Sequence, residues 1–247
     1  MPNHVTTRCV ITGDLDAILQ FRKLYIVTVE NKCGDYLKFD FDRIIPMPEC
    51  LKDADESCDS HEAVKVICLL SEDNVNAGNG LYVHQIERIR ASVNMPHESL
   101  SKVARAYLLA NPEYWEKGKK RIENILETGY GGWYQWSIDN WGTKWNSYDF
   151  EQISVAPFTF TFDTAWSFPE PIFKELAEMF PMLHFYCQCF DEAWNFAGEG
   201  YYNPPAGCKR FDYCDATKEL YEAVYGEPPD NDVVDAMGEV TVEATVE

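Results

Sequence analysis

The sequence lacks long apolar runs and an even set of cysteines. No stretch approaches the ~20 apolar residues of a membrane helix. Met1 to Gly13 has neither the basic nor the apolar region of a signal peptide. We therefore expect a soluble protein in the cytoplasm. Nine cysteines are an odd number for a disulfide framework, so reduced thiols fit better.

Basic residues are scarce in the second half of the chain. From Asp149 to Glu247 there are 20 acidic and 4 basic residues, which supply −16 of the total charge of −20. Such a surface repels phosphate backbones and anionic lipid. We expect no direct binding of nucleic acid or membrane through this half, whereas a basic protein surface would be attracted to it.

Metal and phosphate motifs are also missing. The five histidines form no H-x-x-x-H or H-E-x-x-H pattern, and the glycine-rich segments 129–132 and 198–200 lack the lysine of a phosphate loop. Four cysteines, Cys187, Cys189, Cys208 and Cys214, could bind zinc, but their spacing departs from the usual pattern. We expect buried free thiols, no metal and no cofactor.

The first half of the sequence begins as a strand that leads into a helix. Val5 to Thr12 is rich in β-formers, and Asp14 is a good N-cap for the apolar-periodic run after it. From about His61 to Thr128, apolar residues recur at three and four positions, which predicts a helical insertion.

The second half alternates strands and helices. Phe158 to Phe162 has phenylalanine at every second position, as a half-buried strand should. Ser167 to Glu170 resembles a capping box before a helix, and strands over 183–190 and 194–202 precede a helix at about 215–225. This order predicts an α+β fold, a ferredoxin-like antiparallel sheet with helices on one face, with Val5 to Thr12 as the missing strand.

Four segments follow from these patterns. Residues 1–48 form an N-terminal strand and helix that pack on the sheet, and 49–130 form the mostly helical insertion. Residues 131–226 form the ferredoxin-like domain. Residues 227–247 form an acidic tail that we expect to be disordered.

Tryptophans at positions 133, 136, 141 and 145 cluster within thirteen residues. Aromatic rings can stack nucleobases or methylated ammonium groups. The simpler interpretation is a core and a rigid turn, because tryptophan buries a large area and Gly142 permits a tight bend. The sequence favours the core but leaves binding open.

Three blocks carry a family resemblance: residues 1–5, the segment Phe41 to Pro48, and the segment Asn140 to Ser167 with Pro169 following. Together they resemble the YubB-like proteins of conjugative plasmids and phages. The resemblance implies a C-terminal ferredoxin-like domain and a bacterial mobile-element setting, in which accessory proteins often act against host defence. It implies no catalytic residue.

The leading hypothesis is a non-enzymatic binding protein that mimics DNA and inhibits a host nucleic-acid-binding defence protein, of the anti-restriction or anti-CRISPR type. Duplex DNA carries one charge per ~1.7 Å, so an excess of 16 charges corresponds to roughly 27 Å. Mimicry predicts one continuous acidic surface. The candidate partner-binding residues are Asp149, Glu151, Asp163, Glu170, Glu175, Glu178, Asp191, Glu192 and Glu199.

Two alternatives stay open. If initiator methionine is removed, Pro2 could act as the general base of a tautomerase, with Arg8 or Arg43 binding a substrate carboxylate. The chain could instead be a structural or assembly factor in conjugation or phage growth. The oligomeric state does not follow from the sequence.

Overall fold

The chain folds as two units. The structure is a computed structural model that describes residues 3–70 and 81–230. Residues 1–46 and 137–247 form one unit, here the sheet unit, and residues 47–136 form the other, the helical unit. The sequence-based boundaries stood at 48/49 and 130/131. Most of the expected acidic tail, from residue 231 on, lies outside the described residues.

The sheet unit contains a six-stranded antiparallel sheet in the order β4-β5-β1-β6-β7-β8. Its elements are β1 (His4–Gly13), α1 (Leu15–Tyr25), β4 (Tyr148–Val155), β5 (Phe158–Ala165), α8 (Glu170–Met179), β6 (Leu183–Asp191), β7 (Ala197–Tyr202), β8 (Asp212–Cys214) and α9 (Lys218–Tyr225), with a hairpin of β2 (Ile26–Val29) and β3 (Tyr36–Phe39) and a short helix η1 (Phe41–Arg43). The predicted strand Val5 to Thr12 is confirmed as part of β1, between β5 and β6. The succession β1-α1-β4-β5-α8-β6 is the βαββαβ order of a ferredoxin-like fold.

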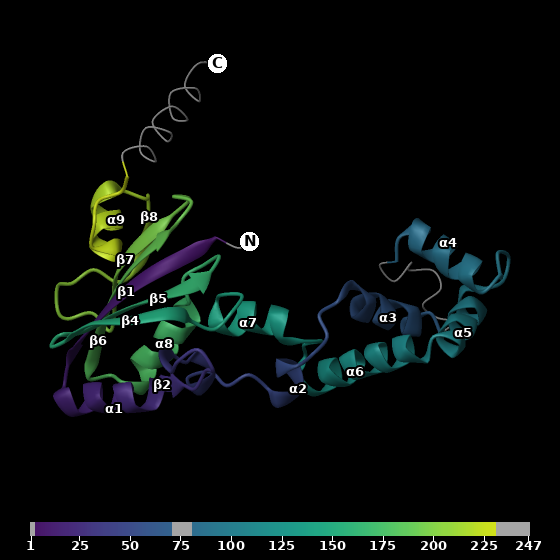
Figure 1. Cartoon of the computed structure of the whole chain (residues 1–247), viewed down its shortest axis with the longest axis horizontal. Coiled ribbons are helices and arrows are strands. Elements are labelled where there is room, and N and C mark those ends of the chain that lie inside the picture. The colour runs from purple at the N-terminus through teal and green to yellow at the C-terminus, as the bar shows by residue number, and fades with distance from the viewer. Residues whose placement is uncertain (1–2, 71–80, 231–247) are drawn as a thin grey trace, which may run out of the picture. The chain divides into compact units, whose positions relative to one another are not determined.

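One face of this sheet is apolar and carries α1 and α8 (Figure 1). Cys9 of β1 lies opposite Phe160 of β5 and Cys187 of β6, so these side chains share a face. Phe21 of α1 packs against Phe160 and Phe185, and Phe173 of α8 packs against Phe185 as well. The alternation of phenylalanines in β5 therefore serves a buried core, as predicted.

The opposite face carries α9. The sequence predicted this helix at about 215–225, but the expectation that all helices lie on one face is wrong. Phe190 of β6 has the opposite parity to Phe185, and it forms a cluster with Ala197, Leu220 and Val224. Two helices thus lie on the expected face and a third lies on the other (Figure 1). We call this second side the α9 face.

Two predicted helix caps have different outcomes. Asp14 caps α1 as predicted, because its Oδ1 accepts a hydrogen bond from the Ala17 N–H at 2.9 Å. The capping box at Ser167 is wrong: α8 begins at Glu170 with Pro169 as N-cap. Ser167 Oγ instead donates to the carbonyl of Gly142 at 2.5 Å, so its hydroxyl ties the turn to another loop.

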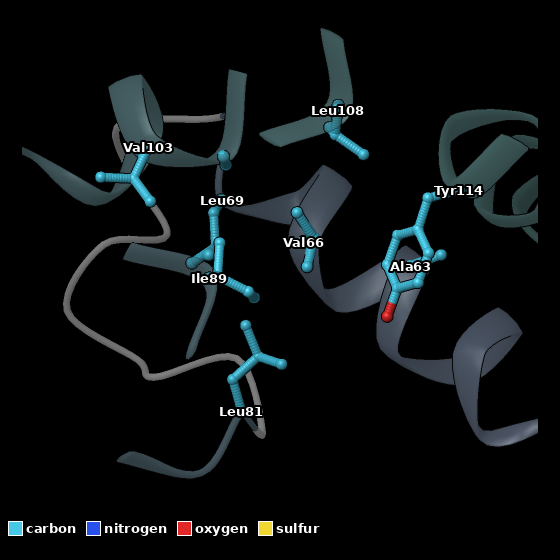
Figure 2. Packing of buried hydrophobic residues seen from close by; sticks show 9 residues of the cluster. Ala63, Val66, Leu69, Leu81, Ile89, Val103, Leu108 and Tyr114 are labelled. Carbon is cyan, nitrogen blue, oxygen red and sulfur yellow. The ribbon is translucent and has the colours of Figure 1, made fainter. Parts of the chain in front are cut away.

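The helical unit contains α2 (Glu49–Lys52), α3 (Cys58–Cys68), α4 (Val83–Ser92), α5 (Leu100–Ala110) and α6 (Pro112–Thr128), and the unit boundary falls within α7 (Trp133–Trp141). Apolar side chains of α3, α4 and α5 point toward one another, with Tyr114 of α6 at the edge of the cluster (Figure 2). Gly118 lets α6 approach α3 closely, since a Cβ there would lie 2.6 Å from Ile67 Cδ1. These helices form a core of their own.

Candidate functional site

A row of polar side chains crosses the α9 face from edge to edge, one from each strand. In strand order it runs Glu151, Thr161, Arg8, Gln188, Glu199 and Asp212. Arg8 lies in the middle, and its guanidinium donates to Gln188 Oε1 at 3.1 Å. Acids occupy both ends of the row, so this face becomes more negatively charged toward its margins.

At one margin, three acids surround a histidine and a tyrosine. The Tyr148 hydroxyl lies 2.9 Å from His4 Nδ1, and Glu192 accepts a hydrogen bond from the His4 backbone N–H at 2.7 Å. Burial raises the pKa of the Asp163 carboxyl, and the charges of Asp149 and Glu192 raise it further. Burial also raises the pKa of Tyr148, as do the same three carboxylates. The site thus concentrates negative charge.

The raised pKa of Asp163 predicts a pH-dependent stability. The folded chain binds the Asp163 proton more tightly than the unfolded chain does. Protonation of Asp163 therefore stabilises the fold fully at pH values below the ordinary carboxyl pKa, and this stabilisation is lost as pH rises through the raised pKa. We expect the stability of Asp163→Asn, measured relative to that of the natural chain, to be higher at pH 7 than at pH 3. Thermal midpoints of both proteins at the two pH values measure this. An identical difference at both pH values would contradict it.

Two grooves flank α9 on this face. The first, of about 320 Å³, lies between the C-terminal end of α9 and the strands, and Arg8, Glu151 and Asp163 line it. The second, of about 440 Å³, is lined by Glu199, Asp215 and other residues near the start of α9. Both are open depressions with acidic side chains, and Ala223 lines both of them.

The carboxylates of the second groove lie close enough to neighbouring side chains to raise their pKa values. The Tyr186 hydroxyl donates to Glu199 Oε2 at 3.1 Å, and burial, followed by the Glu199 charge, raises the pKa of Tyr186 to about 12. Cys214 has a raised pKa because of burial first and then the charge of Glu199, with Asp215 and Asp212 adding to it. A thiol in this setting is a poor nucleophile.

The nine acids proposed from the sequence do not form one surface. Five of them lie on the α9 face or its margin: Asp149, Glu151, Asp163, Glu192 and Glu199. Three, Glu170, Glu175 and Glu178, belong to α8, which covers the opposite face. The expectation of one continuous stripe through all nine is therefore wrong, because strand and helix geometry places them on two sides.

Asp191 is not a surface residue. Its side chain is 1% exposed, and its Oδ2 accepts hydrogen bonds from the backbone N–H and the side-chain amide of Asn195 at 3.1 and 2.6 Å. Asp191 thus holds the turn between β6 and β7, where it has a structural role. It cannot contact a partner.

The tryptophans divide between core and surface. Trp136 and Trp141 are buried, and Trp141 Nε1 donates to the carbonyl of Ile45 at 2.9 Å. Trp145 is 38% exposed, and Trp166, which lies outside the cluster of positions 133 to 145, is 42% exposed. The core interpretation therefore applies to Trp136 and Trp141, whereas Trp145 and Trp166 are partly exposed at the surface.

The four cysteines considered as zinc ligands do not share one environment, because two are buried and two are exposed. Cys187 and Cys189 are buried on the apolar face, and Cys208 and Cys214 are exposed. Burial raises the pKa of Cys187, whose Sγ lies 3.9 Å from Cys9 Sγ. Within residues 3–70 and 81–230, no group of three or more histidine, cysteine or acidic residues could hold a metal ion.

Pro2, the proposed base of the alternative enzyme, lies outside the described residues. Of its two suggested arginines, Arg8 is engaged with Gln188, and Arg43 donates to the carbonyl of Leu24 at 3.4 Å and lies 3.8 Å from an Asp40 carboxylate oxygen. Arg8 lies on the α9 face, and Arg43 lies in η1.

Sequence reasoning missed four acids that complete the α9 face. They are Asp212, which lies opposite Glu199, Asp215 and Glu219 in the second groove, and Glu222 on α9. The available signal was the periodicity of the last helix, because Leu220 and Val224 mark its buried side. Its acids therefore had to point away from the sheet.

With the sheet and its acidic face established, comparison with known proteins identifies the fold. Residues 140–207 match the ferredoxin-like domain in Api92-like proteins. This segment contains β4, β5, α8, β6 and β7, so the match agrees with the topology of the sheet unit.

The crystal structure of protein Api92 from Yersinia pseudotuberculosis is similar with 9% identity and a TM-score of 0.38, over 88% of this chain and 99% of that one. No curated protein matches the chain. In the described parts of the chain, no helix has the length and apolar character to cross a bilayer.

Proposed function

We propose that this chain is a non-enzymatic binding protein whose acidic α9 face occupies a basic, nucleic-acid-binding surface of another protein. The observation that carries the proposal is the collection of acids from four strands, two connecting segments and a helix on one side of the sheet. They are Asp149, Glu151, Asp163, Glu192, Glu199, Asp212, Asp215, Glu219 and Glu222.

The bases near this face are few. Arg8 lies at its centre and Lys218 at the start of α9, and Lys209 and Arg210 lie in the loop beside the β7–β8 edge. Nine acids against these four bases and Lys144, which lies over Trp145 at the margin of the face, leave a net charge of −4. This corresponds to roughly 7 Å of duplex DNA at ~1.7 Å per charge. The described face therefore suits a compact basic patch of a nucleic-acid-binding protein.

The setting is part of the proposal. The blocks that resemble YubB-like proteins of conjugative plasmids and phages favour a mobile-element accessory protein in the bacterial cytoplasm. A host defence protein of the restriction or CRISPR type must bind nucleic acid through a basic surface. An acidic face that competes with nucleic acid for that surface would inhibit it.

The test compares two variants, each of which replaces three glutamates with glutamine. The face variant carries Glu151→Gln, Glu192→Gln and Glu199→Gln. The control variant carries Glu170→Gln, Glu175→Gln and Glu178→Gln on α8. Each removes three charges and keeps side-chain length. Each protein is immobilised and exposed to bacterial lysate at ~50 mM salt. We expect the natural chain and the control to bind a bacterial protein from the lysate, and the face variant to bind at least about tenfold less of it.

The retained protein must then be displaced by duplex DNA and released by salt at ~500 mM, because both compete for the same charge interactions. Mass spectrometry identifies it, and its purified form repeats the measurement by calorimetry. Equal loss of binding in both variants would show that net charge, not the α9 face, determines binding. Failure of duplex DNA to compete would refute mimicry.

A further inference from the structure

Two aromatic rings of the sheet unit, Trp145 and Trp166, lie around the side chain of Lys144, and we call these two rings the aromatic clamp. The Lys144 ammonium nitrogen lies 4.6 Å from the centroid of the Trp145 ring and 4.6 Å from that of the Trp166 ring. Both distances are within the ~6 Å range of a cation–π interaction, for which tryptophan is the best partner. The clamp therefore already holds a cation, supplied by the chain itself.

The backbone presents both rings at one end of the strands. Trp145 precedes β4 and Trp166 follows β5, and these strands are antiparallel neighbours. Thr143 Oγ1 donates to the carbonyl of Ala165 at 2.8 Å, and Trp166 N–H donates to the carbonyl of Asn3 at 2.9 Å. The first bond joins the two segments, and the second ties Trp166 to the residue before β1.

Trp166 is held in an unfavourable conformation. Its φ of 76° lies in the left-handed region, which a bulky residue rarely adopts and which costs about 1–3 kcal/mol. Its side chain nevertheless remains 42% exposed, so this conformation does not serve to bury the ring. Strain that presents an exposed aromatic ring is typical of a binding surface.

The clamp adjoins the acidic margin of the α9 face. The Trp145 and Tyr148 ring centroids are 6.5 Å apart, and Tyr148 contacts His4 beside Asp163 and Glu192. Aromatic faces next to carboxylates attract cations by two mechanisms, the ring quadrupole and net charge. The occupant must therefore be positively charged.

We propose that Trp145 and Trp166 receive an arginine side chain of the partner protein, and that Lys144 fills their clamp until the partner binds. The inference deepens the proposed function, on which it rests for the nature of the partner. Arginine suits the site better than lysine, because its planar guanidinium stacks on aromatic rings and is more weakly hydrated than an ammonium. It can therefore replace the Lys144 ammonium.

The test uses N-acetylargininamide as the probe and the two indole N–H signals of Trp145 and Trp166, observed by NMR in the full chain. Lys144→Ala empties the clamp, so we expect it to bind the probe about five- to tenfold more tightly than the natural chain does. Lys144→Ser repeats the measurement with a polar replacement. Adding Trp166→Ala to Lys144→Ala should abolish the gain, whereas adding Trp115→Ala, at a tryptophan 37% exposed in the helical unit, should not.

Several outcomes would overturn the inference. Equal affinity in the natural chain and both Lys144 variants would show that Lys144 does not occupy the binding position. Tighter binding of N-acetyl-trimethyllysinamide than of the arginine probe would exclude arginine as the occupant. The probe tests the clamp without any partner, and the α9-face glutamine variant tests the acidic face while keeping Lys144, Trp145 and Trp166. The failure of one proposal is therefore distinguishable from the failure of the other.

Discussion

Replacing Phe160 with alanine is expected to lower the free energy of unfolding of the sheet unit by about 3–5 kcal/mol. The Phe160 side chain is fully buried at the centre of β5. Its ring lies within 6.3 Å, centroid to centroid, of those of Phe21, Phe39, Phe150, Phe158 and Phe162. The cavity left by alanine borders rings from three other elements, α1, β3 and β4, so no single neighbour can fill it.

Hydrogen exchange of the amides in β1 and β5 measures this loss in the sheet unit alone, because the helical unit has a separate core. Val155→Ala on the adjacent β4 is the control. Its side chain is 63% exposed, so we expect a change within about 0.5 kcal/mol. A Phe160→Ala loss below about 1 kcal/mol would mean that the phenylalanine cluster is not the core of this unit.

The local parts of the fold were predictable because their signals are local. The alternation of Phe158 to Phe162 predicts a strand with one buried face, and Asp14 predicts where α1 begins. The partners of β1 were not predictable in the same way. β1 pairs with strands more than 140 residues away, and periodicity within one segment carries no information on such pairing.

The position of α9 left a weak trace in the sequence. β6 departs from alternation near its end, where Cys189, Phe190 and Asp191 are all buried. A strand that is buried on both sides must be covered on both faces. The β-rich composition of this segment predicts the strand but not its burial on both faces, so the placement of α9 on the second face was not predicted.

The acidic site was only partly predictable, because charge was counted along the chain while strands and helices distribute it in space. Glu151, Asp163 and Glu199 reach one face through the two-residue period of their strands. The three α8 acids lie on the other side, and Asp191 is buried in a turn, where its carboxylate accepts hydrogen bonds from Asn195. The clamp was harder still, since one of its tryptophans lies 22 positions further along the chain than Lys144.

A pair of glycines offers the second large effect with an internal control. Gly13 and Gly34 have nearly equal φ angles, 127° and 124°, which L-residues rarely adopt. A Cβ on Gly13 would lie 2.3 Å from the carbonyl oxygen of Met182, whereas one on Gly34 would meet nothing within 4 Å. Alanine at either position is therefore strained, but only alanine at Gly13 also displaces backbone.

We expect Gly34→Ala to cost about 1–3 kcal/mol through its backbone conformation alone. Gly13→Ala should cost about 1–3 kcal/mol more, since the added methyl group forces the end of β1 away from β6, with which Gly13 pairs at Leu183. Urea unfolding followed by tryptophan fluorescence measures both. Equal losses would show that the chain between α8 and β6 yields to the methyl group. A larger loss for Gly13→Ala would establish that the β1–β6 pairing, which carries Arg8 and Gln188 to the middle of the α9 face, is rigid at this end.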